Sequence, residues 1–572
     1  MKKKITLLTI LASLTLVSCG GQTSDSTTPS EPSNNLSSEI SSDLVKEDLL
    51  IIADEQGKTD YKFVFGDVSD NMLYYLEEYI YKYIDEKNID IVGSPSSSNV
   101  SEKEILLGLT NRQESIDLYN CIMPSTYAIK EINGKIVVSA HDEAHLKKGL
   151  EKLYEVIEKN DGSNWSIEKG YAFYGDEFMN TYVPKLANTD GKFDGSYYCE
   201  DETQEIGYKK ATLNDFNNYC LLLEGNGYTK QFDNQVANSM FATYTNDVAL
   251  VNVSYYPEKE RVHVLYEPKG YLPTQQAFNN KVIDASFTQI GRSGASQSSS
   301  GLSLTVQLED GSYIMIDGGP LDSNDEMKLL NFLKDNNPNE GKPKVTWIFT
   351  HAHHDHMNLA VSFLNKYYDE IDVTMFAFNF PDFDSLVITQ EPVDRIEKSK
   401  SLIKEFNEVY NKHYKDVPIY KFHTGDKLQL AGCEIEFLIT HETFWPNDFP
   451  WINHTSSAFT VTIDNKKMMV LGDCEQTECQ WMEEVYKEEL KSDILQVTHH
   501  GLNGGSLLMY QYVDPDICFW AIDKNRYETN SYCLGQHGCD FNIWIRNDKI
   551  KDRDHYHASE TTTLKVKDLW YS

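Results

Sequence analysis

The sequence predicts an α+β protein of several domains, and three observations support this fold class. Apolar runs that end beside Asp, His or Gly recur along the chain and indicate buried strands, for example at 345–349 and 467–471. Other segments, such as 393–410, carry apolar residues at helical spacing. The dipeptide Asn133-Gly134 between two apolar runs is a strong hairpin signal. A length of 572 residues predicts two or three domains.

The first residues predict export and anchoring. A lysine-rich start precedes a short apolar run, residues 5–17, which is too short to span a bilayer. Small residues then lead to Cys19, so residues 1–18 are predicted to be a lipoprotein signal peptide, with lipid attached to the Cys19 sulfur. The alternative is an ordinary secretion signal with an incidental cysteine. Residues 19–43 are rich in Ser, Thr and Pro and predict a flexible tether on the outer face of a bacterial cell membrane.

Two small domains are expected between the tether and the C-terminal half. The first, an accessory α+β domain over 44–190, should contain helices at 72–86 and 146–157, a strand at 104–109 and a hairpin of 127–132 with 135–140. The second, a small α+β domain over 191–280, should contain a helix at 213–223 and strands at 239–245, 248–255 and 261–266. A spacer or packing partner is the expected role of the second domain.

The most informative motif of the C-terminal half is T-H-A-H-H-D-H at 350–356. It places His351, His353, Asp355 and His356 at fixed offsets, directly after the apolar run 345–349. Neutral imidazole and carboxylate are the ligands that Zn²⁺ and similar metals prefer. A strand end followed by a tight loop can direct several such groups to one point. The motif therefore predicts a metal site.

Other strands of this half also end beside candidate ligands. Residues 313–316, which form an expected hairpin with 303–308, lead to Asp317; 467–471 lead to Gly472-Asp473; and 493–498 lead to His499-His500-Gly501. Each piece alone is weak, because a strand that ends in Asp-Gly is most often a turn. Taken in this order after the histidine motif, they support one another.

This order of motifs resembles the metallo-β-lactamase fold hydrolases. The strings N-H-T-S-S-A-F (453–459), V-L-G-D-C-E (470–475) and D-I-L-Q-V-T-H-H-G (493–501) are most similar to the branch that contains the extracellular domain of the DNA-uptake protein ComEC. The resemblance covers about half of the chain and implies a four-layer αββα sandwich over 281–572. It also implies a metal centre at the sheet edge where strand ends meet.

The resemblance implies two divalent metal ions, zinc first and manganese as the alternative. Around the first ion it implies His351, His353, His454 and Asp473; around the second, Asp355, His356, His499 and Asp473. Asp317 would orient a ligand histidine from behind.

Some of these positions remain open. His500 is the alternative to His499, because the sequence does not separate adjacent histidines. For His454 the alternative is His441, which ends the apolar run 437–440, and the ComEC-like branch often carries Asn at this motif, where Asn453 is adjacent.

The implied chemistry is hydrolysis by a hydroxide that bridges the two metals. Coordination lowers the pKa of water from about 15.7 toward 7, and Asp355 and Asp473 would be the catalytic carboxylates that hold the ions. A leaving alkoxide needs a proton. His557 is the expected donor, with His500 and His555 as alternatives.

The predicted function is a cell-surface binuclear metal-dependent hydrolase, most of all a phosphodiesterase or esterase. Its expected substrate is a small-molecule or cell-wall phosphodiester. Tight binding of duplex DNA is not expected, because the net charge of −36 repels phosphates. The alternative is a substrate-binding or scaffold lipoprotein with a structural metal site. A complete double ligand set weighs against this alternative, because structural zinc sites are usually single and closed.

Overall fold

A computed structural model describes residues 49–569 of the chain, with gaps. The gaps are 67–83, 86–89, 94–99, 120–121, 123–126, 141, 159–164, 176–183, 185–192, 199–202, 269, 277–280, 293–300, 384–387, 445–448, 503 and 530–552. The expected signal peptide, Cys19 and tether lie outside the described residues, as does most of the expected helix at 72–86. In the described residues, no helix combines the length and apolar character that crossing a membrane requires.

The N-terminal described part is built on a six-stranded sheet. Its order is β3 (Asp90–Gly93), β2 (Lys62–Phe65), β4 (Glu104–Leu107), β6 (Lys135–Ala140), β5 (Tyr127–Ile132) and β8 (Ala172–Tyr174). The expected hairpin is confirmed: β5 and β6 pair antiparallel, and Asn133 and Gly134 both have positive φ, as a two-residue turn requires. Helix α3 (Glu143–Glu158) confirms the second expected helix and buries Leu146, Leu150 and Leu153 in the core of this part. The remaining elements are α2 (Gln113–Tyr119) and the pair β1 (Leu49–Ala53) with β7 (Trp165–Glu168).

The next part is a six-stranded antiparallel sheet, larger than the three strands expected. Its order is β11 (Thr229–Val236), β12 (Ser239–Thr245), β13 (Ala249–Tyr256), β14 (Arg261–Pro268), β10 (Gln204–Tyr208) and β9 (Phe193–Tyr198). Helix α4 (Leu213–Gly225) begins with a capping box between Thr212 and Asp215, and its apolar side chains share a core with this sheet. Strands β10, β11 and β9 carry few continuous apolar runs, which is why the sequence pattern did not reveal them.

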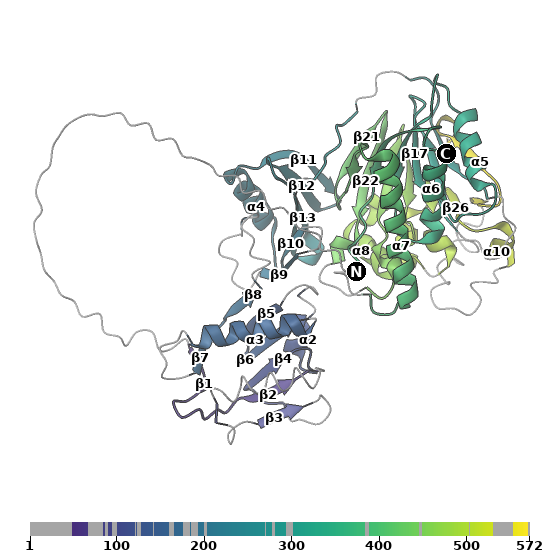
Figure 1. Ribbon diagram of the computed structural model, residues 1–572. Coiled ribbons are helices and arrows are strands. Elements are labelled where there is room, and N and C mark those ends of the chain that lie inside the picture. Colours follow the sequence, from purple (N-terminus) through teal and green to yellow (C-terminus); the bar gives the residue numbers. More distant parts are fainter. Residues whose placement is uncertain are drawn as a thin grey trace, which may run out of the picture. The chain divides into compact units, whose positions relative to one another are not determined.

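Two seven-stranded sheets form the C-terminal half (Figure 1). The first has the order β20 (Ile419–Tyr420), β19 (Asp372–Ala377), β18 (Lys344–Ile348), β17 (Tyr313–Asp317), β16 (Ser303–Gln307), β15 (Ser286–Gln289) and β28 (Thr562–Lys565). The second has the order β21 (Lys427–Leu430), β22 (Cys433–Ile439), β23 (Ala458–Ile463), β24 (Lys466–Val470), β25 (Ile494–Gln496), β26 (Ile517–Trp520) and β27 (Asp554–His557).

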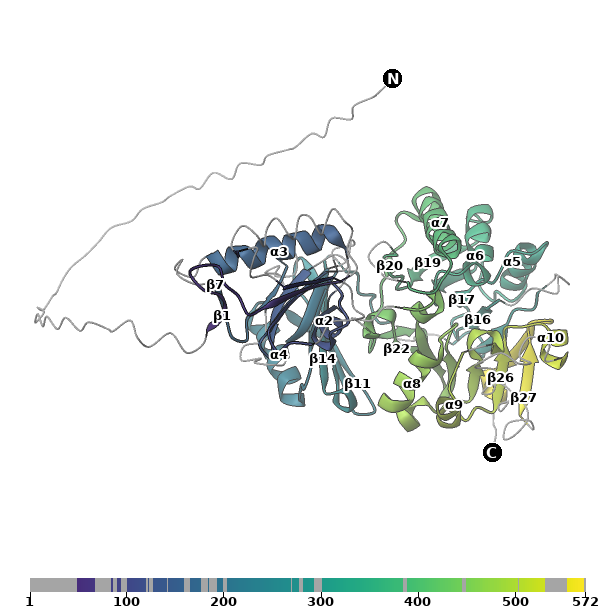
Figure 2. The same ribbon diagram turned by 90° about the horizontal axis from the view of Figure 1, so that it is seen from below.

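Three apolar cores show that these sheets form the middle of four layers. The central core joins side chains of both sheets, including Phe287, Ile316, Phe437 and Val461. A second core lies between the first sheet and α5 (Asp325–Asp335), α6 (His354–Lys366) and α7 (Val393–Val409). A third lies between the second sheet and α8 (Gln476–Val485) and α9 (Leu507–Val513). Figure 2 shows α5, α6 and α7 on one outer side and α8 and α9 on the other. The αββα sandwich expected from the resemblance is confirmed.

Parallel pairing decides where the functional side chains meet. Strands β17 to β20 run parallel to one another, and so do β24 to β27. Parallel strands bring their carboxyl ends to a common sheet edge. Asp317 is the last residue of β17, and the segments that follow β18, β24 and β25 carry the histidine motif, Asp473 and His499-His500. These residues therefore lie where strands leave their sheets at such edges.

Candidate metal centre

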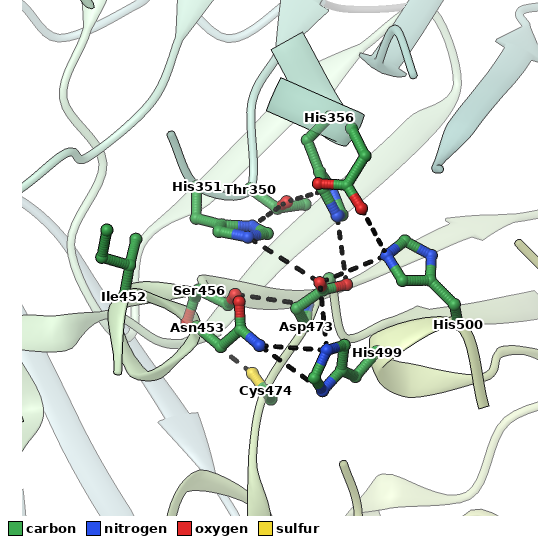
Figure 3. Close-up of polar contacts among 12 residues, drawn as sticks. Thr350, His351, His356, Ile452, Asn453, Ser456, Asp473, Cys474, His499 and His500 are labelled. Carbon is green, nitrogen blue, oxygen red and sulfur yellow. Dashed lines mark hydrogen bonds and ion pairs between the residues drawn. The ribbon is translucent and has the colours of Figure 1, made fainter. Parts of the chain in front are cut away.

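Five side chains from three chain segments form two overlapping groups around His356 and Asp473. Figure 3 shows His351, His356, Asp473 and His500 pointing toward one another. The His356 Nε2 atom lies 3.1 Å from Asp473 Oδ1, and His351 Nε2 lies 3.9 Å from Asp473 Oδ2. His500 Nε2 lies 3.2 Å from Asp355 Oδ2 and 3.3 Å from Asp473 Oδ2. Among the described residues, two groups can each hold a metal ion: His351 with His356 and Asp473, and Asp355 with His356 and His500. Metal ligation therefore has a geometric basis here.

Local backbone structure directs the first motif toward this point. Strand β18 ends at Ile348, and α6 begins at His354, with His353 as the residue that precedes its first turn. The intervening loop is held by the buried carboxylate of Asp317, which accepts hydrogen bonds from the Thr350 amide (2.8 Å) and hydroxyl (2.7 Å). The other end of α6 is tied to α7 by apolar packing.

Asp317 also contacts His356, the residue shared by both groups, on the side of its ring that faces away from Asp473. The distance from His356 Nδ1 to Asp317 Oδ2 is 2.7 Å, and both side chains are fully buried. With Nδ1 donating to this carboxylate, Nε2 of His356 points toward Asp473. Such a carboxylate–histidine pair is typical behind a metal-binding imidazole, and it is the contact that the resemblance implied for Asp317.

The unpaired atoms of the cluster fit a bound cation. His351 Nε2, His356 Nε2, Asp473 Oδ1 and both ring nitrogens of His500 are buried and make no hydrogen bond within the part of the chain that the structure describes. Buried polar atoms normally have a partner, and one without a partner calls for an ion or water. Imidazole and carboxylate donors that converge in this way suit zinc or manganese.

The electrostatics of the cluster favour the same conclusion. Burial alone would raise the pKa of Asp473, but the imidazoles of His356, His500 and His499 lower it well below its usual range. Burial, together with the neighbouring His356 and His353, lowers the pKa of His351 well below its usual value. At neutral pH, Asp473 is therefore an anion and His351 is neutral, which are the forms that bind a metal.

His356 differs in its protonation. Burial opposes its charged form, but the carboxylates of Asp473 and Asp317 outweigh burial and raise the pKa of His356 well above its usual value. Occupation of Nε2 by a metal would release this proton. For Asp355, burial alone would raise the pKa, but the neighbouring imidazole of His500 outweighs burial and lowers it far below the usual range.

His353 is placed beside the two groups rather than within them. Its ring lies next to that of His351, with the centroids 4.7 Å apart. Burial lowers its pKa to about 4, so it too is neutral at physiological pH.

The structure corrects the choice between the two adjacent histidines. His500, rather than His499, lies among the candidate ligands. His499 Nδ1 is bound to Glu475 Oε1 at 3.0 Å, and its Nε2 lies 3.1 Å from Asn453 Nδ2. The Nε2 atom of His499 remains 4.0 Å from Asp473 Oδ2. The physical reason is that hydrogen-bond partners within the protein already occupy both ring nitrogens of His499.

His454 is also outside both groups, which runs against its assignment to the first ion. Its Nδ1 binds Glu478 Oε1 of α8 at 2.8 Å, so the ring serves as a tie between α8 and the turn η6 (Ile452–Thr455). The alternative, His441, begins the short helix η5 (His441–Phe444) and is not in either group.

The expected proton donor, His557, is not brought to the cluster either. It ends β27, the last strand of the second sheet, and its ring lies 5.0 Å from that of Tyr527. His555 accepts a hydrogen bond from the indole of Trp520 at 3.0 Å. His500, the third candidate donor, is in a ligand group.

Sequence reasoning missed Glu475 and Glu478, and it considered Asn453 only as an alternative ligand. Asn453 donates to Glu475 Oε1 at 3.0 Å, and Glu478 accepts from the Glu475 amide at 2.9 Å. The spacing of the two glutamates at the start of an expected helix is a capping signal. That signal could have identified the start of α8, but not its contacts with histidines.

Comparison with known proteins gives structural similarity only. No protein-family model matches the chain, and no curated protein matches it. The solved structures that match include the metallo-β-lactamase fold protein YhfI from Bacillus subtilis, with 13% identity over 49% of this chain and 99% of that chain, at a TM-score of 0.28. Zn²⁺-bound PqqB from Methylobacterium extorquens matches with 11% identity over 49% of this chain and 100% of that chain, at a TM-score of 0.31. The short form of human tRNase Z matches with 10% identity over 49% of this chain and 99% of that chain, at a TM-score of 0.26.

These identities and TM-scores are low, so the fold class rests on the two sheets and their helices, and the nature of the site rests on its side chains. The C-terminal half is an αββα sandwich with a candidate metal centre at the sheet edge where β18, β24 and β25 end.

Proposed function

We propose that this chain is a metal-dependent hydrolase with two metal ions. The observation that carries the proposal is the pair of ligand groups that share His356 and lie around Asp473. We assign His351 and Asp473 to one ion, with the adjacent ring of His353 as a further candidate ligand. We assign Asp355, His356, His500 and Asp473 to the other ion. Bound ions of this kind polarise an electrophilic centre and make water more acidic.

The protein itself holds the ligand side chains in position before the reaction begins. Asp317 fixes the orientation of His356 through its Nδ1 atom, and Thr350 fixes Asp317 in turn. Asp473 supplies negative charge to both assigned sites from a side chain that is 2% exposed. A preorganised centre of this kind needs little rearrangement when charge develops in the transition state.

We propose a phosphodiester or related ester as the substrate, and the outer face of the cell membrane as the location. The motifs that resemble the ComEC-like branch support the bond type, and the Cys19 sequence supports a lipid anchor. A surface-anchored enzyme meets small phosphodiesters and phosphodiester-linked polymers of the cell wall. Zinc is the first metal that we propose and manganese the second.

An activity screen of the metal-loaded full chain tests this proposal. The substrates are bis-p-nitrophenyl phosphate, phosphorylcholine esters, single-stranded DNA and nitrocefin, with Asp473→Asn as the inactive control. Hydrolysis of a phosphodiester by wild type alone supports the proposal, and turnover of nitrocefin alone would move the substrate to a β-lactam. Failure on every substrate by a protein that holds two ions would favour the binding or scaffold lipoprotein.

A further inference from the structure

The two histidines in the turn that follows β25 have an unusual backbone. His499 has φ 45° and ψ 46°, and His500 has φ 56° and ψ 14°, so both lie in the left-handed region. Residues other than glycine rarely adopt it, since Cβ then approaches the following carbonyl oxygen. Two consecutive histidines in this conformation persist only if their surroundings hold them there.

The surroundings of His499 provide such a hold. Glu475 accepts from Nδ1 of the ring at 3.0 Å, and Asn453 Nδ2 lies 3.1 Å from Nε2. Asn453 also donates to the same Glu475 oxygen at 3.0 Å, which closes a triangle of three side chains. Figure 3 shows the contact between Asn453 and His499. This orientation of the Asn453 amide is the favourable one, because the flipped amide would place its oxygen against the glutamate carboxylate.

The backbone on both sides of the pair is also held. The His499 amide donates to Gly472 O at 3.0 Å, directly before Asp473, and the Leu502 amide donates to His499 O at 2.8 Å. Gly501, which follows His500, has φ +79°, and a Cβ there would lie 2.4 Å from the Trp520 ring. The segment therefore has little freedom to turn His500 elsewhere.

His500 shows the opposite pattern of contacts. Neither of its ring nitrogens makes a hydrogen bond within the described part of the chain, and its side chain is only 2% exposed. Its Nε2 lies between the carboxylates of Asp355 and Asp473. The ring nitrogens of His499 therefore have partners within the protein, whereas the ring of His500 faces the candidate metal centre.

We propose that His499 is a positioning residue, held by Glu475 and Asn453 so that the strained backbone directs His500 to the metal centre. The inference rests on the proposed function only for the presence of metal ions. It assigns new roles to Glu475, the residue that precedes α8, and to Asn453, in the turn η6, both far from His500 in sequence.

Metal binding by a set of variants tests this proposal. Zinc affinity is measured by competition with a chelator, and the geometry of the site is followed by the visible absorption of the Co²⁺-substituted protein. His500→Ala should hold one ion. Glu475→Ala and His499→Ala should still hold two at saturating metal, with the affinity for one ion reduced roughly 10- to 100-fold and its Co²⁺ spectrum changed. Glu475→Gln retains an oxygen that accepts from Nδ1 and should restore most of the affinity.

Glu483→Ala is the matched control. Glu483 is a partly buried glutamate of the same helix, and it accepts from the Met509 amide at 2.9 Å and from the Ser506 hydroxyl, without touching His499. The Glu483→Ala variant should bind both metal ions with the affinity of the wild type. The proposal is overturned if His499→Ala loses an ion and His500→Ala keeps both. It is also overturned if Glu475→Ala binds as wild type does, or if Glu483→Ala weakens binding equally. The zinc affinity and the Co²⁺ spectrum are measured without substrate. A failure of this proposal is therefore distinguishable from a failure of the proposed hydrolase activity.

Discussion

Asp473 is the residue on which both assigned metal sites depend. Its carboxylate lies within 3.3 Å of His356 and His500, and the side chain is buried. We predict that Asp473→Ala lowers the metal content from two ions toward none and reduces hydrolysis by roughly a thousandfold or more, because ion-based charge stabilisation is worth several kcal/mol. Elemental analysis and initial rates check this. Asp369→Ala, a change at an exposed residue, should leave both unchanged, and two ions in Asp473→Ala would contradict the assignment.

The loop before β21 shows how an element is fixed by close packing. Gly425 has φ +91°, its amide donates to Phe437 O, and a Cβ there would lie 2.1 Å from the Phe241 ring of β12. We predict that Gly425→Ala lowers the free energy of unfolding by more than about 2 kcal/mol, because it combines backbone strain with overpacking. Urea unfolding measures this.

Gly341→Ala is the matched control for Gly425→Ala. Gly341 has the same φ of +91°, but a Cβ there meets nothing within 4 Å. It should lower stability only by the cost of the left-handed backbone, about 1–2 kcal/mol. Equal losses in the two variants would show that the contact with Phe241 contributes nothing.

At the scale of the whole molecule, a buried charged cluster joins β14 to the C-terminal half. His423 is 1% exposed; its Nδ1 lies 2.8 Å from Glu442 and its Nε2 lies 3.1 Å from Glu267 of β14. Burial alone would lower the pKa of His423, but these two carboxylates raise it well above 6.5. A folded pKa above the unfolded value means that protonated His423 stabilises the fold in full below about pH 6.5, and that this contribution is lost as pH rises through the folded pKa.

We therefore predict a pH-dependent effect of His423→Gln. The variant should lower the free energy of unfolding more at about pH 6 than at about pH 9, because only the protonated ring makes the two ion pairs. Urea unfolding at both pH values measures the difference. The control is His413→Gln, at a partly buried histidine whose ring stacks on Tyr368 and whose pKa is lowered by burial. This variant should not lose more stability at about pH 6 than at about pH 9. A loss that stays constant with pH would mean that His423 contributes through packing alone.

The anchoring of the molecule is a separate prediction. If Cys19 carries the lipid, full-length chain should fractionate with membranes and incorporate labelled fatty acid. Cys19→Ala should lose the label, because the sulfur is the attachment point. Cys220→Ala, at a buried cysteine of α4, is the control and should keep it. Fatty-acid labelling of Cys19→Ala would contradict the lipoprotein assignment.

The sequence by itself determined the fold class and several of the side chains that the structure brings together in the candidate centre. The apolar runs before Asp317, His351 and Asp473 identify strands that the structure contains, and the hairpin at Asn133-Gly134 is formed as predicted. These features are local: a buried strand needs an apolar run, and a two-residue turn needs positive φ. The histidine motif is local as well, because its residues share one loop and the first turn of α6.

Only the tertiary structure decided which histidines point to the centre. His499 and His500 are neighbours of the same type, and they differ because Glu475 and Asn453, from other segments, occupy the ring of one and not of the other. His454 fits the motif by position, yet Glu478 of α8 binds its ring. A side chain's direction depends on backbone angles and on partners that arrive from elsewhere in the fold, and neither is written in the spacing of residues along the chain.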